Sequence, residues 1–266
     1  MKEWQWTIRA EKPKRENTTM NLIQVASLCN SDKLEHGYIE IYDNIFSSLK
    51  DDKINFLEIG VYGGASAELW NRYFSNANIF MSDIFDKTDI LSKVDVNFFR
   101  GDSGNEKDTT KLLEFAKAKT GTATFDIIID DGSHFQHDQM NGIGNLFPYL
   151  TSGGYYIIED ICYEEDLKNG SMWWGHSKEP HHSVPGPCHA GAQLRTDEEW
   201  LAGSEKDFAA CTDATIKRYA ETNVFSSKYL SDSKNKYITD NVERLEYHSN
   251  DTGLDCTSKL AVFKKR

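Results

Sequence analysis

The chain has 266 residues, of which 39% are hydrophobic and 12% aromatic, enough to bury the core of one large α/β domain or of a domain with an appendage. Its formal net charge of −12 and its pI near 5.1 argue against nucleic acid as a partner, because phosphate binding needs a basic surface. We therefore expect a small substrate that is neutral or cationic.

The sequence also gives expectations about the membrane and the compartment. No apolar run approaches the roughly 18 residues that a membrane span needs, and the first residues lack the apolar stretch of a signal peptide. The five cysteines are scattered and form no C-x-x-C pair, which is typical of reduced thiols in a cytosolic protein. We expect a cytoplasmic protein with no membrane contact.

The first predicted elements are helices. After a charged arm of 17 residues, Asn17 offers an N-cap for a short helix that ends near Leu28. A polar turn follows, and then a second helix buries one face, which consists of Ile39, Tyr42, Phe46 and Leu49. The two tryptophans of the arm suggest subunit contacts in a homo-oligomer.

From residue 54 the hydrophobic pattern alternates between buried strands and amphipathic helices. The predicted strands are 55–59, 78–82, 96–100, 125–129 and 155–158, and the predicted helices between them are 65–74, 107–117 and 137–147. A turn is expected at 152–154, directly before the fifth strand. Such alternation implies a parallel sheet with right-handed crossovers. A helix at 206–220 and a hairpin of strands 242–247 and 259–263 complete the chain.

Residues 161–203 interrupt this rhythm with Gly, Pro, His and Trp and little periodicity. Loops of this length are usually lids, binding loops or disorder. We expect a lid with Trp173 and Trp174 as apolar walls, because the spacing of its histidines and Cys188 matches no structural zinc site. The predicted organisation is an N-terminal arm with helices at 1–50, and a main domain at 51–266 that carries this lid.

Charged residues follow two of the predicted strands. Asp130, Asp131 and His134 come directly after one strand, and Glu159 and Asp160 end the next. In open α/β sheets, ligands bind outside the carboxyl ends of the strands. So many carboxylates in one place would repel each other without a cation, so we expect a metal ion there. The alternative is a polar loop that only caps the next helix.

The first strand leads into the segment Glu58-x-Gly60-x-x-Gly63-Gly64-x-Ser66, which is typical of a nucleotide-binding turn before a helix. It lacks the dinucleotide fingerprint, which argues against a dehydrogenase. An acidic residue at this strand end suits a cationic amino-acid cofactor such as S-adenosylmethionine. The predicted cofactor-binding residues are Glu58, Gly60, Gly64, Ser66, Asp83 for the ribose hydroxyls, Asp102 and Ser103 near the adenine, and Asp130. Alternatively, Asp130 satisfies only backbone donors, or the domain binds another nucleotide.

These motifs resemble the macrocin and mycinamicin sugar O-methyltransferases. The resemblance covers about residues 30–160 and is carried by Glu58–Ser66, Arg100–Asp102, Ile128–His134 and Ile157–Asp160, with Ser31-Asp-Lys33, His36 and Tyr38 before the first strand. It implies a class I enzyme that uses S-adenosylmethionine and a metal ion. By this resemblance, Asp131, Glu159 and Asp160 hold Mg²⁺, and His134 is the general base.

We therefore predict a Rossmann-like class I methyltransferase fold: a doubly wound, mostly parallel seven-stranded sheet with a C-terminal antiparallel hairpin. The predicted activity is O-methylation of a small polyhydroxylated molecule, such as a natural-product sugar. The alternatives are a catechol or amine acceptor, or a non-catalytic nucleotide-binding subunit of another enzyme, with His137 as the rival base. The sequence from 161 onward matches nothing in the family, so the substrate is not implied.

Overall fold

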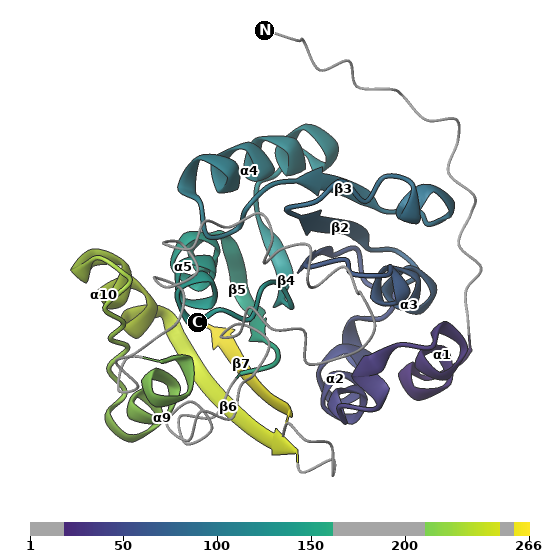
Figure 1. Cartoon of the computed structure of the whole chain (residues 1–266). Helices are drawn as coiled ribbons and strands as arrows, with labels where there is room; N and C mark the ends of the chain where they lie inside the picture. Colours follow the sequence, from purple (N-terminus) through teal and green to yellow (C-terminus); the bar gives the residue numbers. More distant parts are fainter. Residues whose placement is uncertain (1–18, 162–210, 251–257) are drawn as a thin grey trace, which may run out of the picture.

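The computed structural model describes residues 19–161, 211–250 and 258–266, in which one sheet lies between two layers of helices (Figure 1). The N-terminal arm and residues 162–203 of the predicted lid lie outside this part of the chain. So do Trp173, Trp174, Cys188 and the histidines of that segment. No helix in the described ranges is long and apolar enough to cross a bilayer.

The sheet confirms the predicted topology. Its strands are β1 (Asn55–Ile59), β2 (Asn78–Asp83), β3 (Asn97–Arg100), β4 (Phe125–Asp130), β5 (Leu150–Ile158), β6 (Val242–Asn250) and β7 (Ser258–Lys265). Their order is β3-β2-β1-β4-β5-β7-β6. The first five strands are parallel, and β7 runs antiparallel to both β5 and β6. The carboxyl ends of β1, β4 and β5 therefore lie next to one another.

The helices mostly follow the predicted pattern. They are α1 (Leu22–Cys29), α2 (Tyr38–Phe46), α3 (Ala65–Tyr73), α4 (Glu106–Thr120), α5 (Gln136–Leu146), α9 (Thr212–Thr222) and α10 (Asp232–Asn241), with short 3-10 turns at Asp32–Leu34, Ser47–Leu49, Ile90–Lys93 and Phe147–Tyr149. The cap predicted at Asn17 is wrong, because α1 begins after Asn21, which forms a capping box with Gln24. Helix α10 was not predicted, since only Ile238 of its residues is buried.

Both faces of the sheet are buried, which explains why its strands read as unbroken apolar runs. Phe56, Ile127 and Ile129 pack in the core shared with α1, α2 and α3. The alternate residues Leu57 and Ile128 pack in the second core, with α4, α5 and α9. The sheet is therefore doubly wound, as predicted.

The turn predicted at 152–154 is wrong. Strand β5 runs continuously from Leu150 to Ile158 through these residues. The chain accommodates Gly153 at φ +78°, and the register against β4 shifts between Phe125 and Ile127. The glycine pair thus forms an irregularity inside a long strand, as glycines in strands often do.

Helices α1 and α2 pack into the same core as the sheet, although the sequence suggested a division near residue 50. The Trp70 ring lies 5.6 Å from that of Tyr42 and 5.7 Å from that of Phe46, in edge-to-face geometry. This packing fixes the turn between the two helices against the carboxyl ends of the strands, where it supplies Lys33 to a buried acidic group.

Candidate active site at the carboxyl ends of the strands

The acidic residues at the ends of β4 and β5 lie side by side because the backbone hydrogen bonding of the sheet continues for one residue beyond each strand. The Asp131 amide donates to the carbonyl of Ile59 at 3.0 Å, and the Glu159 amide donates to the carbonyl of Asp130 at 3.0 Å. These bonds hold the strand ends at one edge of the sheet. The structure therefore places the predicted acidic residues of both strands in one site.

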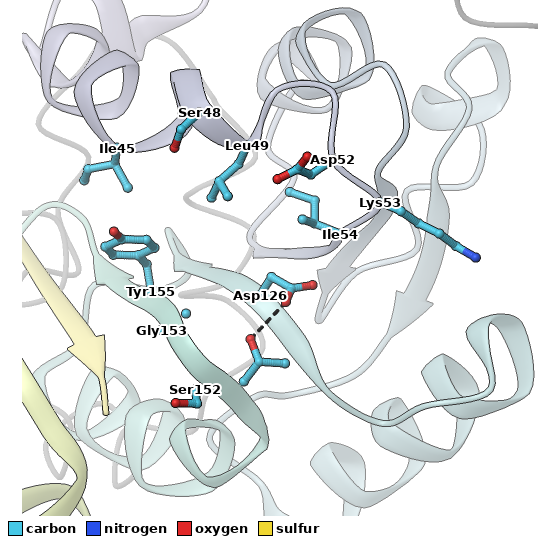
Figure 2. Close-up of a pocket in the computed structure, with 12 residues that line it drawn as sticks. Ile45, Ser48, Leu49, Asp52, Lys53, Ile54, Asp126, Ser152, Gly153 and Tyr155 are labelled. Atoms are coloured by element: carbon cyan, nitrogen blue, oxygen red, sulfur yellow. Dashed lines mark hydrogen bonds between the residues drawn. The ribbon is translucent and has the colours of Figure 1, made fainter.

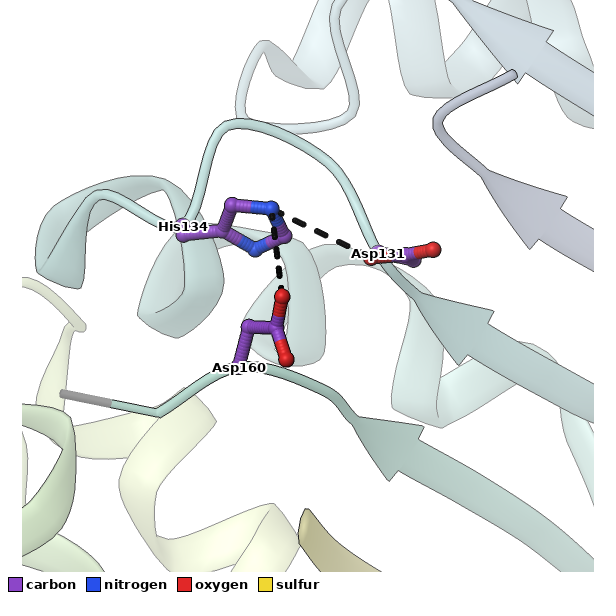
Figure 3. A group of neighbouring side chains, drawn as sticks. All are labelled: Asp131, His134 and Asp160. Carbon is purple, nitrogen blue, oxygen red and sulfur yellow. Dashed lines mark ion pairs between the residues drawn. The ribbon is translucent and has the colours of Figure 1, made fainter. Parts of the chain in front are cut away.

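His134 lies between the two acidic strand ends (Figure 3). Its Nε2 atom is 3.9 Å from Asp131 Oδ1 and 3.9 Å from Asp160 Oδ2. The side chains are 18%, 24% and 11% exposed for His134, Asp131 and Asp160. One ligand atom from each lies within 4.8 Å of the others, so the group could hold a metal ion that reaches it from solvent.

Two residues of this group have a strained backbone. His134 adopts φ +59° and Asp160 adopts φ +51°, both in the left-handed region that residues with a side chain rarely occupy. Each such residue costs about 1–3 kcal/mol, and such strain is concentrated at functional sites. The strain supports a functional interpretation of the two loops.

A second group, called here the enclosed group, is built around Lys33, with Asp131 as its partly exposed member. The Lys33 ammonium lies 2.6 Å from Asp131 Oδ2, 2.8 Å from each carboxylate oxygen of Glu159 and 3.1 Å from Glu58 Oε1. Lys33, Glu58 and Glu159 are each at most 2% exposed. Glu159, predicted as a metal ligand, thus contacts an ammonium group in this structure. The carboxylate of Asp131 belongs to both groups.

Helix α2 and the turn before it supply hydroxyl and imidazole donors to the other strand end. Tyr38 donates its hydroxyl to Asp160 Oδ1 at 2.6 Å, and His36 Nδ1 lies 3.4 Å from the same oxygen. Tyr42 donates to Glu159 Oε1 at 2.5 Å. Sequence reasoning assigned Tyr42 only to a buried helix face, and noted Lys33, His36 and Tyr38 only through the family resemblance.

The charges of the two groups depend on these contacts. Burial alone would raise the pKa of Asp160, but the hydrogen bond from His36 and the nearby imidazoles lower it to about 2. Burial raises the pKa of Glu58 to about 7, against the attraction of Lys33. Burial by itself would lower the pKa of Lys33, yet the three nearby carboxylates hold this pKa well above its usual value. Lys33 therefore remains an ammonium ion at neutral pH.

The predicted cofactor residues at the ends of β1 and β2 contact protein groups. Glu58 is fully buried and accepts from the Trp70 indole N–H at 3.1 Å. Asp83 accepts from the backbone amides of Val61 at 3.0 Å and Phe85 at 2.8 Å. Both side chains brace the loops that leave these strands. Their role in cofactor binding stays a prediction.

The remaining predicted cofactor residues, Asp102, Ser103 and Asp130, lie in turns or beneath the site. Asp102 Oδ1 accepts from the Gly104 amide at 2.8 Å, and the Ser103 carbonyl accepts from Asn145 at 3.1 Å. Asp130 accepts from the Tyr156 hydroxyl at 3.1 Å, and burial raises its pKa to about 7. The structure does not bring Asp130 into the group formed by its neighbour Asp131 and His134.

The glycine turn after β1 is constrained from inside the protein. Gly60 has φ +93°, and a Cβ atom there would lie 1.9 Å from the backbone oxygen of Asp131. Gly64, at φ +86°, precedes α3, which has no side-chain cap, and Ser66 lies in the first turn of this helix. Around Gly63 a Cβ atom would meet nothing within 4 Å. The turn is thus tight against β4 and open at its tip.

A cavity of about 460 Å³ lies at the opposite, amino ends of the strands (Figure 2). Lys53 and Ile54 precede β1, and Asp126 at the start of β4 accepts a hydrogen bond from Thr151 at 2.9 Å. None of the predicted site residues lines this cavity. The side chains with reactive chemistry are gathered at the other edge of the sheet.

Comparison with known proteins confirms the resemblance seen in the motifs. No family model matches the chain. The chain is 33% identical over 153 residues to L-olivosyl-oleandolide 3-O-methyltransferase of Streptomyces antibioticus, covering 54% of this chain and 38% of that protein. It is 34% identical over 133 residues to mycinamicin VI 2''-O-methyltransferase of Micromonospora griseorubida, covering 47% and 32%. The matched relatives are thus sugar O-methyltransferases of the expected type, and the match spans well under half of their length.

The fold is that of a class I methyltransferase, as predicted. The structure resembles MycE methyltransferase from the mycinamycin biosynthetic pathway, solved in complex with Mg, SAH and mycinamycin VI, with a TM-score of 0.60 and 21% identity. This likeness covers 92% of the present chain and 54% of MycE.

We predict that Gly60→Ala destabilises the protein more than Gly121→Ala does. Both glycines have positive φ, +93° and +85°, so both variants carry a backbone cost of about 1–2 kcal/mol. Only at Gly60 does the new methyl group meet backbone, the carbonyl of Asp131. We expect Gly60→Ala to lose at least about 2 kcal/mol more in the free energy of unfolding, measured by urea denaturation. Equal losses would show that the close approach is unimportant.

Proposed function

We propose that the protein is an S-adenosylmethionine-dependent, Mg²⁺-dependent O-methyltransferase. Its substrate would be a hydroxyl group of a small polyhydroxylated molecule, with a natural-product sugar as the expected class. The observation that carries the proposal is the group Asp131, His134 and Asp160 at the ends of β4 and β5. It occurs in a chain that is similar to named sugar O-methyltransferases.

The donor set fits Mg²⁺. This ion prefers oxygen ligands, is usually held by one or two carboxylates, and keeps positions for other ligands. Asp131 and Asp160 supply two partly exposed carboxylates on either side of His134. Glu159 is the third predicted ligand. Because both oxygens of Glu159 contact Lys33, we propose Asp131 and Asp160 as the main ligands of the ion.

The ends of β1 and β2 support a site for S-adenosylmethionine. The turn after β1 is open around Gly63, and α3 begins at Ala65, after Gly64, without a side-chain cap, so that a ligand can approach its first amides. Glu58, Asp83 and the loop of Asp102 surround this end of the sheet from three consecutive strands. We keep these residues as the proposed cofactor-binding set.

The chemistry follows from the position of His134. When bound, the metal ion would lower the pKa of the acceptor hydroxyl, and S-adenosylmethionine would supply the methyl group. His134 would accept the hydroxyl proton at Nε2, the atom that faces both carboxylates. The bond between carbon and sulfur breaks as the bond between carbon and the acceptor oxygen forms, which leaves S-adenosylhomocysteine. Asp131 and Asp160 would stabilise the protonated imidazole.

The test is an assay of methyl transfer by the purified protein. Acceptors with adjacent hydroxyls, including free and glycosidic deoxysugars, are incubated with S-adenosylmethionine and Mg²⁺, and S-adenosylhomocysteine is measured. We expect turnover that EDTA removes and Mg²⁺ restores. Methylation of an amine, unaffected by EDTA, with no product from the hydroxyl acceptors would contradict the proposal.

Replacement of the two histidines tests the base. His134→Ala is expected to lower turnover by about 10²–10⁴-fold, because the proton acceptor is lost. His137→Ala is the matched control, since His137 Nε2 pairs with Asp138 at 2.9 Å on α5 and does not belong to the acidic group. It should retain most of the turnover. If the loss follows His137 instead, the assignment of the base is reversed.

Replacement of the shared carboxylate tests the metal. Asp131→Asn should abolish the Mg²⁺-dependent turnover, while titration calorimetry should show that S-adenosylmethionine still binds, because Asp131 is outside the proposed cofactor set. Asp126→Asn is the matched control: it makes the same change of aspartate to asparagine at the opposite, amino end of β4, and should remain active. Full activity of Asp131→Asn would remove this residue from the metal site.

A further inference from the structure

The carboxylate of Asp131 faces two different surroundings with its two oxygens. Oδ1 lies 3.9 Å from His134 Nε2, on the partly exposed side that also contains Asp160. Oδ2 lies 2.6 Å from the Lys33 ammonium, on the side enclosed by Glu58 and Glu159. Both sides have the donor atoms for a metal ion. The enclosed side already contains a cation, which is the ammonium group of Lys33.

Lys33 occupies the position that an ion would need in the enclosed group. Its nitrogen lies within 3.1 Å of all three carboxylates, Glu58, Asp131 and Glu159. Such buried carboxylates are unstable without a counter-charge. A divalent ion among the same oxygens would stand within a few ångströms of the ammonium and be repelled strongly.

We propose that Lys33 is a positioning residue that serves as the resident cation of this enclosed group and thereby confines a divalent ion to the side of Asp131 facing His134 and Asp160. The inference rests on the proposed function, because it assumes that a divalent ion binds. Lys33 turns one oxygen of Asp131 inward and leaves the other directed toward the imidazole. The ion is then held beside the group that takes the proton.

The test measures binding of Mn²⁺, as a probe for Mg²⁺, by titration calorimetry and electron paramagnetic resonance without any acceptor. The wild-type protein should bind one ion. In the absence of S-adenosylmethionine, Glu58→Gln should bind it within twofold of the wild-type affinity, because Glu58 contacts Lys33 and Trp70 and does not belong to the group of Asp131, His134 and Asp160. Asp160→Asn should bind it at least about tenfold more weakly.

Replacement of Lys33 itself should change the number of ions. Lys33→Met removes the ammonium and keeps a similar side-chain volume, so a second Mn²⁺ should enter the enclosed group. The two ions would share Asp131, and the spectrum should show the coupling of a carboxylate-bridged pair. Lys265→Met is the matched control. Lys265 is a buried lysine at the amino end of the sheet that donates to the carbonyls of Phe147, Pro148 and Leu150, so this variant should bind one ion.

Two results would overturn the inference. The first is a loss of Mn²⁺ affinity in Glu58→Gln as large as that in Asp160→Asn, which would place the ion in the enclosed group. The second is a folded Lys33→Met protein that binds a single uncoupled ion with wild-type affinity. If Lys33→Met does not fold, the comparison of Glu58→Gln with Asp160→Asn decides. Absence of Mn²⁺ binding by the wild-type protein would instead contradict the proposed function itself.

Discussion

The contact of the Lys33 ammonium with two buried carboxylates, Glu58 and Glu159, and with the partly exposed Asp131 is the interaction on which the site depends. Glu58, Asp131 and Glu159 come from three different strands and converge within 3.1 Å of one nitrogen. Breaking such a buried ion pair by removing one partner typically costs about 3–5 kcal/mol, because the other charges are left uncompensated. The turn that carries Lys33 is therefore part of the site, although it precedes the first strand.

The order of the strands explains why these carboxylates meet. β1, β4 and β5 are consecutive neighbours in the sheet, and all three are parallel, so their carboxyl ends share one edge. An acidic residue at or just beyond each of these ends must then lie beside the others. The cavity at the amino ends of the strands, by contrast, is lined by none of the residues of the site. Parallel strands thus place several carboxylates at one edge of the sheet. Lys33, in the turn between α1 and α2, supplies a positive charge to them.

Sequence patterns predicted the sheet and the strand ends because both are local. Buried strands that end in Asp130 or Glu159 are visible as apolar runs followed by charge. Lys33 was not recognised as a buried residue, since a lysine in a polar turn is expected to be exposed. Its partners Asp131 and Glu159 are 98 and 126 residues away in the chain, and no periodicity connects them. Tyr42 was correctly placed on a buried face, but the contact of its hydroxyl group depends on tertiary packing.

The glycine turn shows how one residue type can serve an unexpected purpose. Gly60 was predicted to belong to a cofactor-binding turn, and in the structure the missing Cβ also makes room for the backbone of Asp131. The carbonyl of Asp131 is held against β1 on one side, and its carboxylate is held by Lys33 on the other. Because the backbone and the side chain of Asp131 are both held, the strained loop that leads to His134 begins at a fixed residue. The glycine turn after β1 and the acidic centre are therefore packed as one unit, because the close packing of the turn against the backbone of Asp131 determines where the acidic centre presents its oxygens.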